Sequence, residues 1–159
     1  MIDRVVVVLA AYVSVLLQVG MLSAWPLFGG QPNLIAIGAA AFLMVNRPVL
    51  GLWWIVSGGI LIDLLLPARF GITLLPLLVG YAACFTLLRW AIDIAAWWST
   101  VLIGFVLLFV AELPLIFISG SSQQLPYDLL AGCIVLVPIG IILSYLLAPV
   151  RSGLRISRP

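Results

Sequence analysis

The sequence predicts an all-α integral membrane protein, a compact bundle of about six transmembrane helices. Three observations predict it: 65% of the 159 residues are hydrophobic, only 8% are charged, and the mean hydropathy is +1.36. These values lie far outside those of a soluble protein, which needs a polar surface. A spanning helix takes about 20 apolar residues, so we expect about six spans joined by short loops and no additional soluble domain.

One transmembrane domain, residues 1–159, accounts for the whole chain. Turn-forming or charged residues divide it into apolar segments, and these predict spans at about 5–22, 33–46, 50–66, 72–88, 97–118 and 129–148. A basic cytoplasmic tail follows at 149–159. We expect the second and third spans to be short, so that the helices of the bundle differ in length.

The second span is the shortest. Its apolar stretch of about 13 residues reaches only about 20 Å, against a hydrocarbon core of about 30 Å, so a re-entrant segment is the alternative. A re-entrant segment would hold Arg47 near mid-membrane at a cost of roughly 2.5–3.5 kcal/mol, whereas a short span lets Arg47 reach the interface. We therefore expect a short span.

The arginines predict the orientation, because positively charged short loops stay on the cytoplasmic side. With the N-terminus inside, Arg69 lies outside, and the other arginines lie inside: Arg4, Arg47, Arg89, Arg151, Arg155 and Arg158. Both termini are therefore expected to be cytoplasmic, in a multi-pass protein of the bacterial cytoplasmic (inner) membrane. The tryptophans all fall near predicted span ends, as expected for an interfacial aromatic belt.

The titratable residues offer no catalytic constellation. The chain has no histidine and no lysine, and Cys84 and Cys133 lie in apolar runs that make a thiol inert. The carboxylates lack the spacing of a metal site or an acid–base pair; they are Asp3, Asp63, Asp93, Glu112 and Asp128. We therefore expect no enzyme activity, no catalytic or metal-binding residue and no cofactor. Without an arginine cluster, nucleic acid is excluded as a partner.

Asp63 lies inside the third predicted span, where an ionisable side chain suggests a function by default. An aspartate removes about 3 kcal/mol from the insertion energy of a span, so its charge needs a partner. Arg69 is the nearest candidate in the sequence. Two interpretations stay open. The first, which we favour, is an internal hydrogen bond or ion pair that fixes the turn between the third and fourth spans; the second is a ligand, proton or protein contact.

Gln18 and Glu112 are the other polar candidates expected within spans. Glu112 precedes Pro114, which kinks a helix by freeing a carbonyl. Glu112 fits either a transport site or a structural corner in which the acid caps a neighbouring helix. We favour the corner, because no second intramembrane charge is expected at its depth. Asp128 follows Pro126 and is interpreted as an acid in the first turn of the sixth helix.

Small residues recur at helix-packing spacing in the third span. Gly51 and Gly58 share one face, and Gly59 and Asp63 share the adjacent sector. Such positions let helices approach closely. Packing inside the bundle is the favoured interpretation, and a partner interface is the alternative.

An ordered set of residues between 17 and 81 is specific enough to compare with known families. It comprises Leu17-Gln18 late in the first span, Pro32-Asn33-Leu34 at the second, Gly51, Gly58 and Asp63 in the third, then Pro67, Gly71 and the Gly80-Tyr81 pair. This set resembles the rod shape-determining protein MreD family of the bacterial elongation machinery. The likeness in length and layout covers the whole chain. Members of the family commonly carry an acidic residue where this chain has Asn33.

The resemblance implies a non-enzymatic membrane scaffold that binds an MreC-like protein. Through that protein it would couple to MreB, to the RodA polymerase and to a class B penicillin-binding protein. The candidate residues for partner binding or for structure are Gly51, Gly58, Gly59, Asp63, Arg69, Gly71, Gly80 and Tyr81.

Membrane lipid is the other expected partner. Arg47, Arg151, Arg155 and Arg158 set the topology, and the three arginines of the tail would favour anionic lipid at about 1 kcal/mol each. The competing hypothesis is transport, since six compact helices also resemble the substrate-binding subunits of energy-coupling-factor vitamin transporters. Such a subunit needs a polar pocket on its outer side. The loops at 23–31 and 119–127 offer only Ser, Gln and Tyr for it.

Overall fold

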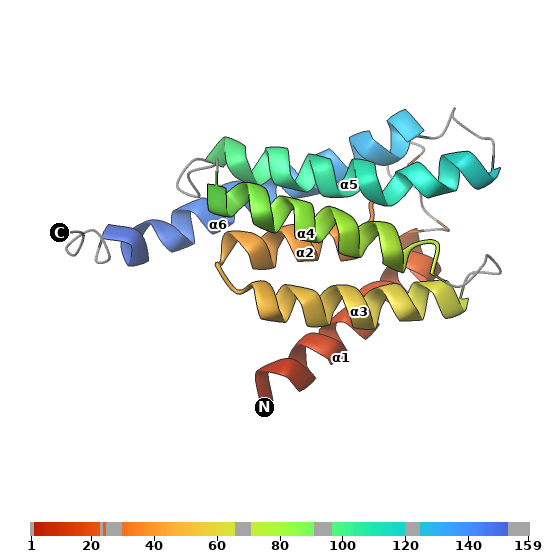
Figure 1. The fold of residues 1–159 in the computed structure, drawn as a ribbon, viewed down its shortest axis with the longest axis horizontal. Coiled ribbons are helices and arrows are strands. Elements are labelled where there is room, and N and C mark those ends of the chain that lie inside the picture. Colours follow the sequence, from red (N-terminus) through yellow and green to blue (C-terminus); the bar gives the residue numbers. More distant parts are fainter. Residues whose placement is uncertain are drawn as a thin grey trace.

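A computed structural model shows an all-helical chain (Figure 1). It describes residues 2–22, 24, 30–65, 71–90, 97–119 and 125–152. The helices are α1 (Ile2–Leu16), α2 (Leu34–Met44), α3 (Pro48–Leu65), α4 (Leu74–Trp90), α5 (Trp97–Ser119) and α6 (Leu125–Ser152). A π-helix, η1 (Leu17–Leu22), continues α1. The expected helical bundle is confirmed for the described residues.

The third helix begins two residues earlier than expected. α2 ends at Met44 with Val45 as its C-cap, and Asn46 takes a left-handed conformation with φ 57°, which asparagine adopts more readily than most residues. Pro48 then begins α3, at a position where the missing N–H of proline costs nothing. α3 has 18 residues, close to the expected 50–66, and it is long and apolar enough to be a candidate membrane span.

α2 begins inside the bundle rather than at its end. Its 11 residues extend about 16 Å, whereas the 18 residues of α3 extend about 27 Å. The tight turn at 45–47 keeps the joined ends of the two helices level, so the start of α2 falls about 10 Å short of the far end of α3. Residues 30–33, called the lead-in segment below, precede this start. Three of them are buried: Gly30, Pro32 and Asn33.

α2 is the central helix of the bundle. It contacts α1, α3, α4, α5 and α6, and Figure 1 shows it between α3 on one side and α5 and α6 on the other. The turn between α2 and α3 lies at the left-hand end of Figure 1, with the C-terminal ends of α4 and α6. The C-terminal ends of α3 and α5 and the start of α4 lie at the right-hand end. Fully buried side chains include Ile35, Ile55, Leu77, Leu107 and Leu136.

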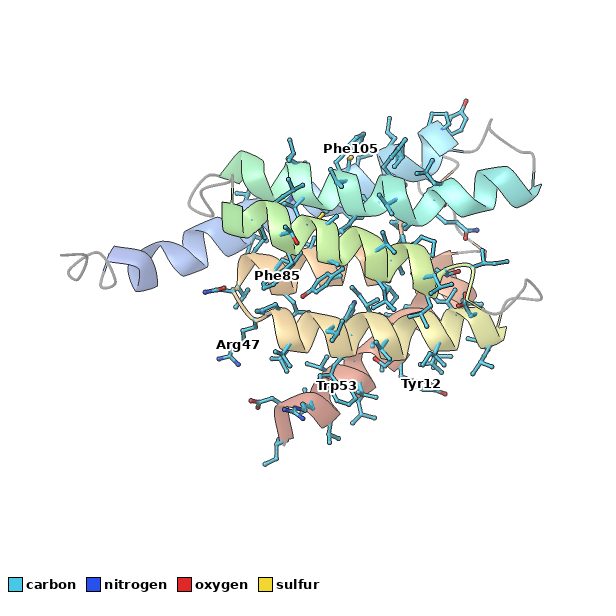
Figure 2. The ribbon with its side chains drawn as sticks, viewed as in Figure 1. Tyr12, Arg47, Trp53, Phe85 and Phe105 are labelled. Atoms are coloured by element: carbon cyan, nitrogen blue, oxygen red, sulfur yellow. The ribbon has the colours of Figure 1, made fainter. Side chains whose placement is uncertain are left out.

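Large apolar side chains fill the core of the described bundle and also lie on its surface. Large apolar side chains are exposed on α1, α3, α4, α5 and α6, among them Leu9, Leu64, Val79, Phe105 and Ile142. Figure 2 shows Tyr12 and Phe105 on opposite sides of the bundle, both pointing away from it. The buried polar and charged residues of the described chain are Asn33, Asp63, Thr73 and Glu112.

Two helices of the described chain are long and apolar enough to cross a membrane, Ile2–Met21 and Pro48–Leu65. Shorter apolar helices accompany them, at Leu34–Met44, Leu74–Leu88, Leu102–Leu113 and Pro126–Ile139. Core helices of soluble proteins and N-terminal signal sequences can meet the same criterion, but a core helix is mostly buried. Here 17% of the first segment, which lies near the N-terminus, and 39% of the second are buried.

Candidate functional site

The candidate residues of α3 and α4 lie at helix contacts inside the bundle. The structure buries Gly51, Gly58, Gly59, Asp63, Gly71, Gly80 and Tyr81. Arg69, the expected partner of Asp63, falls outside the described residues. The contacts of the buried positions are internal, and they connect α3 to α2 and α4, and α4 to α5.

Asp63 holds the start of α4. Its Oδ2 accepts hydrogen bonds from the backbone N–H groups of Gly71 (2.9 Å) and Leu74 (3.3 Å), and its Oδ1 accepts one from Thr73 N–H (3.0 Å). N–H groups at the start of a helix have no partner within the helix. A carboxylate at this position also meets the positive end of the helix dipole. These contacts correspond to the internal interpretation of Asp63.

Gly71 allows the turn that brings these N–H groups to Asp63. Its φ of 92° lies in the left-handed region, which residues with a Cβ rarely adopt. Any other residue at this position would strain the backbone that donates the 2.9 Å hydrogen bond to Asp63. The glycine and the aspartate therefore act as one unit.

Gly51 makes room for the hydroxyl of Tyr81. A Cβ atom at this position would overlap that hydroxyl, and it would lie 3.0 Å from the Cβ atom of Phe42 on α2. The Tyr81 hydroxyl donates a hydrogen bond to the carbonyl oxygen of Pro48 at 2.9 Å. Tyr81 thus joins α4 to the beginning of α3, at the opposite end of α3 from Asp63.

The remaining candidate glycines permit close contacts with neighbouring helices. A Cβ atom at Gly58 would lie 2.5 Å from the Ile35 side chain on α2, and one at Gly59 would lie 2.8 Å from the Leu74 side chain on α4. Gly80 lies against α5 in the same way. Small residues at such positions bring helix axes together. The geometry is that of packing inside the bundle.

Trp54 is buried, so the expectation that every tryptophan lies in an interfacial belt is wrong. Its Nε1–H donates a hydrogen bond to the carbonyl oxygen of Ile35 at 3.0 Å. Its ring occupies the space beside Gly38 on α2, where a Cβ atom would lie 2.5 Å from the ring. In the sequence, the feature that could have indicated this close contact is Gly38, a small residue within an apolar helix. The neighbouring Trp53 is exposed.

Two side chains from distant parts of the sequence accept hydrogen bonds at the start of α2. The Oε1 of Gln18 accepts one from Leu34 N–H at 3.0 Å. The Oδ1 of Asp128 accepts one from Gln31 N–H at 2.7 Å, across 97 positions of sequence. Gln18 belongs to η1, and π-helical turns occur frequently at sites with a specific role. Asp128 lies in the first turn of α6, as expected.

Asn33 and Glu112 form a further polar contact beside these. The Oδ1 of Asn33 accepts a hydrogen bond from Ala36 N–H at 3.1 Å and caps α2. The Asn33 side chain also hydrogen-bonds to Glu112, and Asp128 lies close enough for its charge to act on Glu112. Glu112 therefore supports the capping residue of a neighbouring helix.

The buried polar side chains of the described chain are paired with one another or with backbone. No buried side-chain nitrogen or oxygen in this part of the chain lacks a hydrogen-bond partner. The described residues contain no group of three His, Cys, Asp or Glu side chains that could hold a metal ion. Buried Cys84 lies with its Sγ 3.9 Å from the carbonyl oxygen of Ile103. The arrangement stabilises helix starts and helix contacts.

Of Arg47, Arg151, Arg155 and Arg158, the structure describes the side chain of Arg47. It is exposed in the turn between α2 and α3, and Figure 2 shows it at the left-hand end of the bundle. Arg151 lies in the last turn of α6. Arg155 and Arg158 fall outside the described residues.

Comparisons with protein-family models, with curated proteins and with solved structures give no match for this chain. The resemblance to the MreD family therefore rests on the residues quoted above. A function has to be inferred from those residues and from the geometry of the bundle.

Proposed function

We propose that the chain is a multi-pass protein of the bacterial cytoplasmic membrane. The apolar surface of the bundle carries the proposal, because large apolar side chains are exposed on five helices while Asp63 and Glu112 are buried. In water, each large apolar side chain left exposed forgoes about 1.5–3 kcal/mol of burial free energy. In lipid the same apolar surface is in a favourable solvent. Ionisable side chains of membrane proteins face the interior of the bundle, as Asp63 and Glu112 do here.

The hydrogen bonds at the start of α2 support the same placement. Non-helical backbone can lie at membrane depth only where protein encloses it and pairs its polar groups. Gln18, Asn33 and Asp128 supply acceptors at this point. The lead-in segment, which is buried at Gly30, Pro32 and Asn33, and α2 together then cross the membrane as one short span, which ends at the exposed Arg47.

The orientation in the membrane follows from the position of the arginines. Arg47 and the C-terminal end of α6 lie at one end of the bundle (Figure 2). Positively charged short loops stay in the cytoplasm, so this end and both termini are assigned to the cytoplasmic side. The hydrogen bonds that Asp63 and Asp128 accept then lie toward the outer side.

Within the membrane we assign the chain the role of a non-enzymatic scaffold of the cell-elongation complex, similar to the MreD family. The support is that residues of the resemblance act together: Asp63 holds Gly71, and Gly51 accommodates Tyr81. The likeness thus concerns contacts that determine how α2, α3 and α4 pack. Contacts with an MreC-like protein, and through it with MreB, RodA and a class B penicillin-binding protein, would use the exposed helix faces.

Affinity purification from bacterial membranes in a mild detergent, followed by mass spectrometry, tests this role. We expect an MreC-like protein and wall-synthesis enzymes to be recovered with the chain. Asp63→Asn is an informative variant, because Asp63 is buried and bonds to the backbone at the start of α4. It should lower the yield of the chain without changing the ratio of partner to chain. Co-purification with an ATPase and a coupling subunit, or with a retained vitamin, would contradict the scaffold role.

A further inference from the structure

Arg4 of α1 and Trp53 of α3 form an exposed pair. The guanidinium carbon of Arg4 lies 5.8 Å from the centroid of the Trp53 ring, which is within the range of a cation–π contact. Trp53 is 41% exposed, and Arg4 is exposed as well. Figure 2 shows Trp53 on the side of α3 that faces α1. The pair therefore lies on the outer surface where these two helices meet.

The pair presents a positive charge and hydrogen-bond donors, and the described part of the chain gives it no acidic partner. A guanidinium has five N–H donors and an indole has one, and neither group has an acceptor. Within the described residues, no carboxylate forms an ion pair with Arg4, and no acceptor bonds to Trp53 Nε1. Asp3 precedes Arg4, but successive side chains of a helix do not face each other. The pair is therefore suited to an anion.

An exposed apolar side chain lies beside the pair. Val49 lies one helical turn before Trp53, on the same face of α3, and is more than half exposed. A free anion or an acidic peptide would leave this apolar surface uncovered. A phospholipid provides both parts of the match, because its phosphate binds the donors and its acyl chains cover the apolar side chain.

We propose that Arg4 and Trp53 bind the headgroup of an acidic phospholipid at the cytoplasmic surface of the membrane. This proposal rests on the membrane placement of the bundle proposed above. The Arg4 guanidinium and the Trp53 Nε1–H donate hydrogen bonds to phosphate oxygens, and the acyl chains lie along α3 beside Val49. A zwitterionic lipid is less favourable, because its cationic group adds a second positive charge near Arg4. One arginine near an anionic surface gives about a five-fold preference.

Tryptophan quenching in lipid nanodiscs measures this preference. The intact chain is placed in nanodiscs of phosphatidylcholine with a minor fraction of phosphatidylglycerol, and one lipid at a time carries bromine on its acyl chains. The difference between the unmodified chain and Trp53→Phe isolates the emission of Trp53. At equal mole fraction, brominated phosphatidylglycerol should quench this emission about five-fold more strongly than brominated phosphatidylcholine. Arg4→Gln should abolish the difference.

Arg47→Gln is the matched control, because it removes an exposed arginine that precedes α3 and makes no described contact with Trp53. The preference should survive in this variant. Ile2→Arg combined with Arg4→Gln restores the N-terminal charge on a different face of α1, and here the preference should stay lost. Equal losses in Arg4→Gln and Arg47→Gln, or recovery in the double variant, would indicate general attraction to positive charge and would overturn the site.

Two further results separate the possible failures. Inorganic phosphate at constant ionic strength should leave the preference unchanged, and loss of the preference would assign a soluble anion to the pair. A chain that does not enter nanodiscs, or whose tryptophans are not quenched by brominated phosphatidylcholine, would contradict the membrane placement. Insertion without any lipid preference would contradict the headgroup site alone.

Discussion

Asp63→Ala should lower the melting temperature of the detergent-purified protein by roughly 10 °C or more. The variant leaves the N–H groups of Gly71, Thr73 and Leu74 without their acceptor. A buried donor left unpaired costs about 1–3 kcal/mol, so the three together cost about 3–6 kcal/mol. Asp63→Asn keeps one carbonyl oxygen and should give an intermediate value. Size-exclusion chromatography of heated samples provides the measurement.

Asp3→Asn is the control for Asp63→Ala, since Asp3 is an exposed acid in the first turn of α1. Its melting temperature should stay within about 2 °C of the unmodified value, because surface substitutions usually change stability by less than 0.5 kcal/mol or so. An Asp63→Ala protein as stable as the unmodified one would contradict the assignment of Asp63 to the start of α4.

Gly51→Ala should destabilise the bundle by about 2–4 kcal/mol. The added methyl group would overlap the Tyr81 hydroxyl and crowd Phe42, so α4 must move away from α3. The hydrogen bond from Tyr81 to the carbonyl oxygen of Pro48 would be lost with this movement. The same melting measurement, with the yield of folded protein as a second readout, tests the effect.

A double-mutant cycle separates this mechanism from a general effect of alanine. Tyr81→Phe removes the overlapping hydroxyl, so the two substitutions together should cost about 1–2 kcal/mol less than the sum of the single costs. Gly20→Ala is the matched control, because nothing lies within 4 Å of a Cβ atom at that position. Strictly additive costs, or an equal loss in Gly20→Ala, would mean that the contact between Gly51 and Tyr81 does not limit packing.

Local sequence patterns predicted the parts of the fold that depend on neighbouring residues. The length of each apolar segment predicted a helix, and the spacing of Gly51 and Gly58 predicted a tightly packed face of α3. An aspartate within an apolar run indicated that its charge needs a partner, and its partners are backbone N–H groups at the start of the next helix. These inferences succeed because hydrophobic periodicity and charge burial act over short distances in the sequence.

Contacts between distant segments were not predictable in this way. Asp128 accepts its hydrogen bond from Gln31, 97 positions away, and nothing in either local sequence identifies the other residue. Trp54 looked interfacial because tryptophan favours membrane surfaces, whereas Gly38 on another helix provides an internal site for its ring. The recessed start of α2 likewise depends on how five other helices enclose it. Tertiary packing determined these features.

Labelling of single cysteines in intact bacterial cells tests the membrane bundle most directly. In a chain with Cys84 and Cys133 replaced by alanine, one cysteine is introduced at the exposed Asp3 or at the exposed Tyr127. A membrane-impermeant maleimide should label Tyr127→Cys in intact cells, and it should label Asp3→Cys only after the cytoplasmic membrane is permeabilised. Labelling of Asp3→Cys in intact cells would contradict the orientation. Release of the chain from membranes by alkaline carbonate would contradict the membrane bundle itself.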